Sequence, residues 1–230
     1  MKKTTPETGR SNGAVKAAPN RQRRRKVRIK HSVLERLMRY YLSLQADGFL
    51  ADSEWISSSQ LAGHFNVDAT QVRKDLACAG LEGKPRRGFR RQQVVERIRC
   101  LLGLNMNYNA VIVGAGRLGG AVASYADFRD YGLNVVGLFD SDPGKIGKKV
   151  GGCKVRPADE LENYVASQGV HLAILTCPAE AAHARAEQLV RAGIRAIWNF
   201  SPTTLTVPRN VVVRNEHISV GLAEITYHLR

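Results

Sequence analysis

An apolar run that ends in a glycine-rich turn constrains this chain more than any other feature. Residues 110–113 are apolar, residues 118–125 can form a helix, and the turn between them is Gly114-Ala115-Gly116-Arg117-Leu118-Gly119. In a strand–GxGxxG–helix unit, the first glycine permits a tight turn, the second lets the backbone approach a ligand, and the third lets the helix pack on the strand. The N–H groups at such a helix start attract anions, so the turn predicts a pyrophosphate site.

An acidic residue follows at the distance that a nucleotide fold requires. Asp140 lies 21 residues after Gly119, at the end of the apolar stretch 135–139. A carboxylate at this position can hydrogen-bond an adenosine ribose. GxGxxG alone is a weak signal that also describes incidental glycine-rich turns, but the strand before it, the helix after it and the acid favour nucleotide binding.

Positive charge is concentrated at the start of the chain. The net charge is +15, and residues 1–30 hold 11 Lys and Arg against one acidic residue. This arm lacks apolar periodicity, so we expect residues 1–30 to be disordered in isolation. A basic arm can clamp phosphates or simply raise solubility, and the domain that follows favours the clamp.

The four cysteines, Cys78, Cys100, Cys153 and Cys177, form no CxxC pair and no cluster of zinc-ligand spacing. We therefore expect reduced, mostly buried thiols, no metal site and a cytoplasmic protein. The sequence contains no run of about 18 apolar residues, and no apolar core follows the charged N-terminus, so neither a membrane span nor a secretory signal is expected.

Residues 31–79 carry three helical patterns in the order of a helix-turn-helix. The first lies between His31 and Leu50, with Gly48 as its expected stop. The second follows the N-cap candidates 57–59, and the third spans residues 69–79 after a turn at 66–68. The apolar residues of the third helix share one face. Its outward residues are Thr70, Gln71 and Lys74, with Arg73 on the flank.

This outward face suits the major groove of DNA. Lys74 and Gln71 can reach base edges, whereas Thr70 and Arg73 can bind phosphates. The alternative is an ordinary solvated helix face, but a basic wing at residues 83–89 and the arm favour nucleic acid. Ser59, Lys84, Arg86 and Arg87 complete the predicted DNA-binding set. Asp75 would repel phosphate, so we expect it to pair internally, with an arginine of the wing.

The second half alternates apolar strands with helices. Strands are expected near residues 133–139, 153–156, 170–176, 196–199 and 211–214, and helices at 158–168 and 179–192. This alternation predicts a parallel sheet covered on both faces, which binds ligands at the carboxyl ends of its strands. Residues at two such ends, Thr176, Pro178, Asn199, Phe200 and Ser201, are therefore expected to line the crevice, although ordinary turn chemistry also accounts for them.

Catalytic groups are not evident in this half. No tyrosine has a lysine four residues later, as the relay of short-chain dehydrogenases requires, and few residues remain for a substrate domain. We predict no catalytic residue. The chain ends in an amphipathic segment in which Leu222, Ile225 and Leu229 share a face, and such a helix would suit a partner subunit.

Over about residues 31–229 the chain resembles the Rex family of redox-sensing transcriptional repressors. The matching segments are 59–62, 71–76, 114–119, 139–143, 145–147, 176–179, 192–194 and 199–202. The resemblance implies an α/β protein with a winged-helix DNA-binding domain (31–100), a Rossmann-like NAD(H)-binding domain (101–217) and a C-terminal helix (218–230) exchanged within a homodimer.

The resemblance also implies a function. Such a repressor binds palindromic double-stranded DNA and is released when NADH binds as the NADH/NAD ratio rises. The alternatives are a small NAD-dependent oxidoreductase with a basic N-terminal extension and a CoA-binding module. Asp140 is expected to favour NADH over NADPH by repelling a 2′-phosphate, although Lys145, Lys148 and Lys149 can offset this.

Two departures from the family bear on the switch. The wing has Arg86-Arg87-Gly88-Phe89 where the family has Gly-x-Gly-Tyr, and Asn215-Glu216-His217-Ile218 replaces Asn-x-Asp-Leu. Tyr125 matches a family tyrosine near the nicotinamide, and Arg36 is the nearest match to an arginine of the first helix. We therefore assign the switch to Arg36, Tyr125 and His217, with the hypothesis that a protonated His217 repels Arg36 and makes release pH-dependent. The alternative is that His217 is an ordinary solvent-exposed turn residue.

Overall fold

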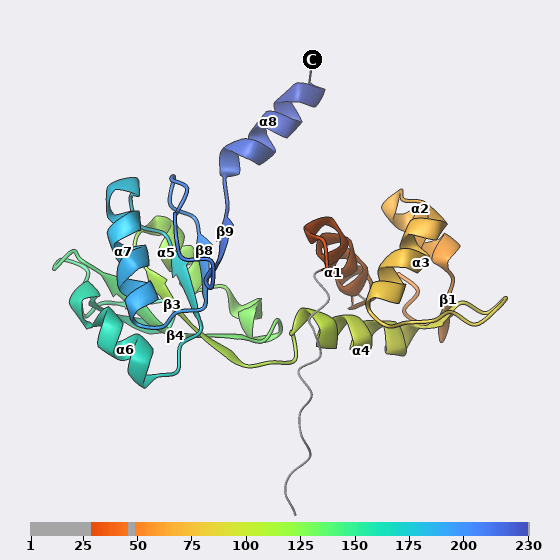
Figure 1. Cartoon of the computed structure of the whole chain (residues 1–230), viewed down its shortest axis with the longest axis horizontal. Helices are drawn as coiled ribbons and strands as arrows, with labels where there is room; N and C mark the ends of the chain where they lie inside the picture. Colours follow the sequence, from red (N-terminus) through yellow and green to blue (C-terminus); the bar gives the residue numbers. More distant parts are fainter. Residues whose placement is uncertain (1–28, 46–48, 230) are drawn as a thin grey trace, which may run out of the picture.

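The computed structural model describes residues 29–45 and 49–229. Two lobes are joined by a short segment between α4 and β3 (Figure 1). The first lobe holds four helices and a two-stranded hairpin, and the second is built on a sheet. Except for its last two residues, the basic arm predicted at 1–30 lies outside the described residues.

The first lobe is a small helical domain with its own apolar core. Its elements are α1 (His31–Gln45), β1 (Trp55–Ile56), α2 (Ser58–Phe65), α3 (Ala69–Cys78), β2 (Phe89–Arg90) and α4 (Arg91–Leu102). Leu37, Ile56, Leu61, Leu76 and Ile98 are buried together at its centre. The stop predicted at Gly48 lies outside the described residues, and α1 is described as far as Gln45. Helix α4 was not predicted, although Val94 and Ile98 have the spacing of a buried helix face.

Local capping explains the tight connection between α2 and α3. Ser57 and Gln60 form a capping box at the start of α2, and Asn66 ends that helix in the left-handed conformation with φ of 50°. The Asp68 carboxylate then accepts the backbone N–H groups of Thr70 and Gln71 at the start of α3. The predicted helix-turn-helix is present.

A buried carboxylate ties α3 to α1. Asp75, 1% exposed, accepts hydrogen bonds from Arg36 Nε (2.7 Å) and Nη2 (2.8 Å), the Tyr40 hydroxyl (3.0 Å) and Gln71 Nε2 (2.8 Å). The predicted internal pairing of Asp75 is confirmed, but the predicted partner, a wing arginine, is wrong because the guanidinium comes from α1. Burial acts to raise the pKa of Asp75, but the hydrogen bonds from Arg36, Gln71 and Tyr40 outweigh it and hold the pKa below the ordinary value.

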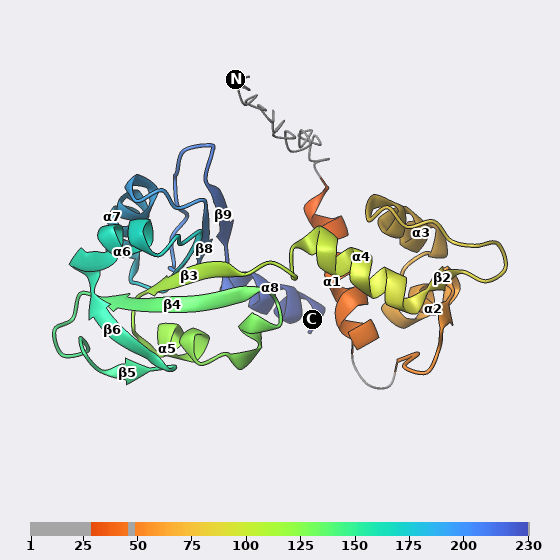
Figure 2. The ribbon, with the colours of Figure 1, turned by 90° about the horizontal axis from the view of Figure 1, so that it is seen from below.

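The second lobe is a mostly parallel sheet with helices on both faces (Figure 2). Within the described residues seven strands run in the order β5-β6-β4-β3-β7-β8-β9. They are β3 (Tyr108–Val113), β4 (Leu133–Asp140), β5 (Lys149–Val150), β6 (Cys153–Pro157), β7 (Leu172–Leu175), β8 (Ala196–Asn199) and β9 (Val212–Asn215). The strand pairs are parallel except β5 with β6, a short edge hairpin of which β6 was predicted at 153–156 and β5 was not.

Each face of the sheet buries a separate apolar cluster. Helices α6 (Leu161–Ser167) and α7 (Ala179–Arg191) cover one face, and α5 (Arg117–Ala123) packs on the other. The short 3-10 helix η1 (Ala126–Arg129) follows α5. The helix predicted at 158–168 begins instead as the 3-10 turn η2 (Ala158–Glu160) and becomes α-helical at Leu161.

The final helix, α8 (Ile218–His228), extends away from the sheet (Figure 1). Its large apolar side chains Val220, Leu222, Ile225 and Tyr227 are each at least 60% exposed. Soluble monomers rarely expose so much apolar surface on one element. Within the described residues, this helix has no apolar neighbour to cover it.

The cysteines differ from the expectation. Cys78 and Cys100 are exposed, Cys153 is half-buried and only Cys177 is buried, so "mostly buried" is wrong; all four are free thiols. The exposed pair lies near the ends of α3 and α4, on the helix faces turned away from the core.

Replacing Asp75 with Asn is expected to lower the free energy of unfolding at neutral pH by roughly 3 kcal/mol, because the Arg36 guanidinium loses its buried counter-ion. The folded-state pKa of Asp75 lies below the unfolded one. Its stabilisation is therefore present above about pH 4 and is lost as pH falls through the folded pKa. Urea unfolding of wild type and Asp75→Asn across the acid range measures this. Exposed Asp52→Asn is the control, and equal acid sensitivity of wild type and Asp75→Asn would contradict the assignment.

Candidate functional site

The three glycines of the turn meet three different surroundings. Gly114 has φ of +111°, and a Cβ built there would lie 2.8 Å from the Thr176 backbone. A Cβ at Gly119 would lie 1.8 Å from the Gly114 carbonyl oxygen, whereas one at Gly116 would meet nothing within 4 Å. The turn therefore needs Gly114 and Gly119 for its own packing, and at Gly116 it offers bare backbone to a ligand.

Asp140 lies against this turn at the end of β4. Its Oδ2 accepts the Ala115 N–H (2.7 Å) and Lys145 Nζ (3.1 Å), and its Oδ1 accepts the Asp142 N–H (2.9 Å). Burial acts to raise the pKa of Asp140, but these hydrogen bonds outweigh it and keep the carboxylate ionised with a lowered pKa. Lys145 thus balances the charge that was expected to repel a 2′-phosphate.

A cleft of about 550 Å³ opens beside the turn at the carboxyl ends of the strands. Predicted residues that line it are Gly114, Gly116, Leu118, Asp140, Thr176, Pro178 and Phe200. The Thr176 hydroxyl donates to the Gly114 carbonyl (2.8 Å), which joins the ends of β3 and β7. Lys145 and Arg185 also line the cleft. Lys145 was predicted only as a charge that offsets Asp140, and Arg185 was not predicted. Arg185 lies within a helix, and no sequence motif marks it as a cleft residue.

Other predicted cofactor residues do not line this cleft. Asn199 is fully buried: its Nδ2 donates to Thr203 O (2.7 Å) and Asn215 Oδ1 (2.8 Å), and its Oδ1 accepts the Ser201 N–H. It holds the loop that carries Phe200. Ser201 is buried against the Cys177 thiol. Ala115 contributes its N–H to Asp140, and Arg117 is exposed at the start of α5.

Tyr125 lies in a separate apolar groove of about 540 Å³. Met38 and Leu42 of α1 form one side of this groove, and Tyr125, Phe128 and Trp198 belong to the second lobe. The Trp198 ring lies 4.8 Å from Phe200 of the cleft, centroid to centroid, so aromatic contacts connect groove and cleft. The groove spans the two lobes, and in a single chain Tyr125 is not a cleft residue.

The proposed switch residues are likewise apart in one chain. Arg36 is committed to Asp75, and His217 is an exposed residue directly before α8. Next to His217, Glu216 accepts Arg214 Nε (2.8 Å) and Trp198 Nε1 (3.1 Å). A repulsion between His217 and Arg36 therefore stays a prediction.

The outward face of α3 is partly engaged. Lys74 is exposed, while Arg73 donates to the hydroxyls of Ser58 (3.1 Å) and Thr70 (3.0 Å). The Gln71 amide donates to Asp75, so it must leave that carboxylate before it can read a base. Ser59 is exposed at the start of α2, near the residue that Arg73 contacts.

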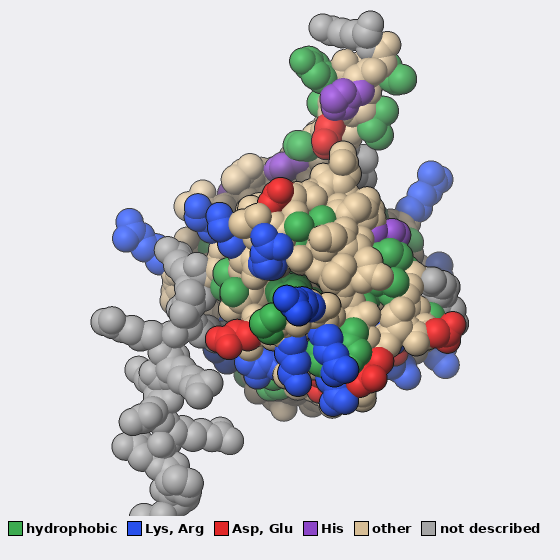
Figure 3. Space-filling view, turned by 90° about the vertical axis from the view of Figure 1, so that its right-hand side faces the viewer, with side chains coloured by type: hydrophobic (Ala, Val, Ile, Leu, Met, Phe, Trp, Pro, Cys, Tyr) green, Lys and Arg blue, Asp and Glu red, His purple; other side chains and the backbone are tan. Residues whose placement is uncertain are grey.

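The wing is a tight hairpin tip that presents cations. Lys84 and Gly88 exchange backbone hydrogen bonds of 2.7 and 2.9 Å, and Arg86 between them has φ of +62°. Lys84, Arg86 and Arg87 are all exposed. The face of the molecule that carries this domain gathers many Lys and Arg side chains (Figure 3), as an electrostatic footprint for nucleic acid requires.

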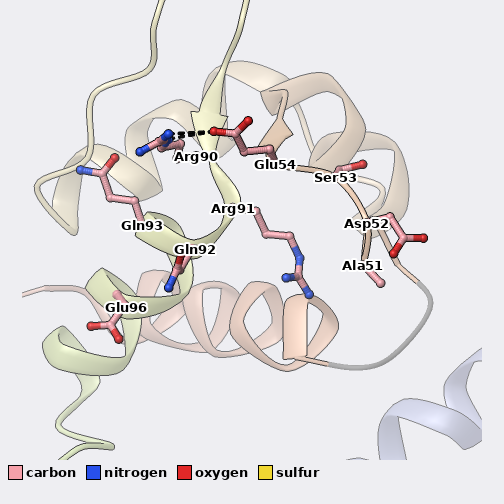
Figure 4. A pocket seen from close by; sticks show the side chains of 9 residues that line it. All are labelled: Ala51, Asp52, Ser53, Glu54, Arg90, Arg91, Gln92, Gln93 and Glu96. Carbon is pink, nitrogen blue, oxygen red and sulfur yellow. Dashed lines mark hydrogen bonds and ion pairs between the residues drawn. The ribbon is translucent and has the colours of Figure 1, made fainter.

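A further hollow lies behind the wing, between residues 51–54 and the start of α4 (Figure 4). Arg90 crosses its rim to pair with Glu54, and Arg91 reaches inward to the Leu44 carbonyl. Three acidic and two basic side chains line this hollow, and Glu54 and Arg90 neutralise each other, so no cationic cluster marks it as a phosphate site.

Two general features bear on the site. In the described part of the chain, no helix combines the length and apolarity needed to cross a membrane. Over the same residues, no group of three or more His, Cys, Asp or Glu is arranged to hold a metal ion.

Known proteins resemble the chain over most of its length. Residues 105–203 match a family model described as "CoA binding domain", and residues 28–77 match one described as "Putative DNA-binding protein N-terminus". The redox-sensing transcriptional repressor Rex of Caldanaerobacter subterraneus subsp. tengcongensis is 37% identical over 205 residues, which are 89% of this chain and 91% of that protein.

The chain belongs to the Rex family. Rex of Carboxydothermus hydrogenoformans is 41% identical over 175 residues, 76% of this chain and 84% of that protein. The crystal structure of RSP in complex with β-NAD+ and operator DNA superposes with a TM-score of 0.83 at 36% identity, covering 89% of this chain and 94% of that one. RSP in complex with β-NADH gives a TM-score of 0.80 with 95% of that chain covered.

These relatives confirm the family and the fold class predicted from the sequence, a DNA-binding domain followed by a Rossmann-like domain. They are named as transcriptional repressors, so the alternative of a small NAD-dependent oxidoreductase is not favoured. The name of the model for residues 105–203 fits the third alternative, but the matches over the whole chain are to repressors.

Gly119→Ala and Gly116→Ala are expected to separate packing from binding. The Cβ at 119 collides with backbone, so unfolding should become easier by roughly 3 kcal/mol. Gly116 has φ of −78° and free space, so its alanine variant should be stabilised by about 0.4–1 kcal/mol. Both should bind NADH weakly in calorimetry. Gly116→Ala with unchanged NADH affinity would show that the ligand does not approach the turn there.

Proposed function

We propose that this protein is a redox-sensing transcriptional repressor that binds palindromic DNA and leaves it when NADH binds. The observation that carries the proposal is a nucleotide cleft, with bare backbone at Gly116 and an ionised Asp140, on the same chain as a helix-turn-helix with a basic wing. Membership of the Rex family and the likeness to RSP support it.

The proposed mechanism is a change in domain arrangement. Two recognition helices must lie about 34–36 Å apart, or a multiple of that distance, to enter successive major grooves of a palindrome. A ligand disturbs this match only by binding the other arrangement more tightly, and reversing a 99:1 preference takes about 5.5 kcal/mol.

The cleft is proposed to favour the reduced nucleotide. Gly114 to Gly119 hold the pyrophosphate, Asp140 the adenosine ribose, and Thr176, Pro178 and Phe200 lie toward the nicotinamide. The reduced nicotinamide ring is neutral and the oxidised ring carries a positive charge, so an apolar surround favours NADH. Tyr125 would join this surround from the groove, through Phe128 and Trp198.

A homodimer is proposed from two apolar surfaces that need covering. Helix α8 exposes its apolar residues, and the groove between α1 and η1 exposes Leu42 and Tyr125. The α8 helix of a second copy, laid into this groove, would cover both surfaces and touch both lobes. The exchange of α8, the domain limits and a cytoplasmic location stay predictions, as does a role of His217 and Arg36 in the switch.

NADH is expected to release the protein from a selected palindromic duplex, and NAD to do so far less well. The physical reason is the differential affinity described above. Fluorescence anisotropy of a labelled duplex, titrated at saturating nucleotide, measures the release. Binding curves that NADH leaves unchanged would contradict the redox-sensing function, whereas a protein that bound no palindrome would contradict DNA recognition itself.

Lys74→Ala and Arg73→Ala are expected to fail differently. Lys74 faces outward and is proposed to read a base, so its loss should cost about 1–3 kcal/mol on the operator and relax specificity at one position. Arg73, anchored beside Ser58, is proposed to bind a phosphate. Its loss should weaken binding to all sequences and flatten the salt slope by about one unit. Equal losses on operator and random DNA for Lys74→Ala would remove Lys74 from base readout.

A further inference from the structure

One tryptophan in the first lobe is surrounded by cations. Lys84 Nζ lies 5.4 Å from the centroid of the Trp55 ring, and the guanidinium carbons of Arg87 and Arg90 lie at 5.6 and 5.8 Å. Each distance is within the range in which an aromatic face attracts a cation, and tryptophan is the strongest such face.

Strand pairing brings these residues to the same place. Trp55 is the register partner of Arg90 in the β1–β2 hairpin, and Ile56 is the partner of Phe89. Ile56 and Phe89 point into the core, so Trp55 and Arg90 point to the opposite face. Lys84 and Arg87 reach the ring from the wing, whose Lys84–Gly88 turn lies directly before β2.

Core packing does not account for this tryptophan. The apolar cluster of the domain, over the described residues, includes Ile56 and Phe89 but not Trp55. The ring is half-buried, in a polar hollow that Glu54, Glu82 and Gln93 also line. Glu54 pairs with Arg90 (2.8 Å), whereas in the part of the chain that the structure describes neither Lys84 nor Arg87 has a carboxylate partner.

We propose that Trp55 is a positioning residue for DNA binding, whose ring holds Lys84 and Arg87 together as a preformed phosphate clamp beside the wing, while Arg90 stays paired with Glu54. The inference rests on the proposed function. Like charges would otherwise separate, and the electron-rich face of the ring keeps them close without neutralising them. Lys84 Nζ and the Arg87 guanidinium carbon lie 5.4 and 5.6 Å from the same ring centroid, so the two cations are held near each other and can engage neighbouring phosphates.

The clamp acts on affinity rather than on sequence. Phosphate contacts carry no sequence information, so the loss of the ring should weaken operator and random DNA alike. Nucleotide binding should not change, because the cleft lies in the other lobe. The ring does not touch DNA in this proposal, and its effect must therefore depend on the cations that it holds.

The test compares Trp55→Leu, Trp55→Phe and wild type on operator and random duplexes at several salt concentrations. Trp55→Leu should bind both duplexes roughly three- to tenfold more weakly, and Trp55→Phe, which keeps an aromatic face, should recover part of the loss. In an Arg87→Gln background the further loss caused by Trp55→Leu should become smaller, because the two residues act together. Arg156→Gln, which removes the cation over Tyr164 in the other lobe, should leave DNA binding unchanged.

Wild-type affinity of Trp55→Leu, no recovery by Trp55→Phe, or losses that simply add to that of Arg87→Gln would each overturn the clamp. If Trp55→Leu fails to fold, the wild-type chain is made with fluorinated tryptophan, which keeps the ring shape but weakens its negative face. Because this also replaces Trp198, Trp55→Phe made in the same way is the control. A loss of affinity that disappears in the Arg87→Gln background supports the clamp, and an unchanged affinity overturns it. A wild-type protein that binds DNA but ignores NADH would contradict the proposed redox function and leave the clamp standing.

Discussion

The nucleotide cleft depends on the close contact between Gly119 and the Gly114 carbonyl. Because no side chain separates them, α5 starts directly against the end of β3. The Thr176 hydroxyl reaches the same carbonyl, and the Asp140 carboxylate takes the adjacent Ala115 N–H. Three strand ends are thereby joined without any ligand. The cleft is therefore preorganised, and in the proposed mechanism the response to nucleotide arises where the two lobes meet.

In the first lobe, a buried carboxylate holds the elements together in a similar way. Asp75 is buried between α1 and α3 and is satisfied by Arg36, Tyr40 and Gln71, so it ties these two helices together. Helix α1 also carries Met38 and Leu42 into the groove beside Tyr125. A group that fills this groove therefore contacts α1, the helix that Asp75 ties to α3. The proposed route from cleft to DNA therefore runs through the two lobes and the groove between them.

Local constraints could be predicted from the sequence, and long-range ones could not. The glycine turn, the Asp140 spacing and the turn between α2 and α3 follow from sterics and capping within a few residues. The partner of Asp75 lies 39 residues away on α1, and no local pattern distinguishes Arg36 from the arginines of the wing. Asn199 is a polar residue at a strand end, as a cleft residue would be, but it is buried and its side chain hydrogen-bonds Asn215 of a neighbouring strand. The surroundings of Tyr125 depend on how the two lobes meet and, in the proposed homodimer, on how the two chains meet.

The two tryptophans of the chain are divided between the lobes. Trp55 lies beside the wing, and Trp198 lies between groove and cleft, in contact with Phe200. Indole emission responds to nearby charge and polarity, and reduced nicotinamide absorbs in the range where indole emits. The molecule thus carries two built-in optical probes, one at each end of its proposed signalling path. Quenching of Trp198 emission by energy transfer would report nucleotide in the cleft. A shift in the emission maximum of Trp55 would report a change of charge at the wing, and neither measurement needs an attached dye.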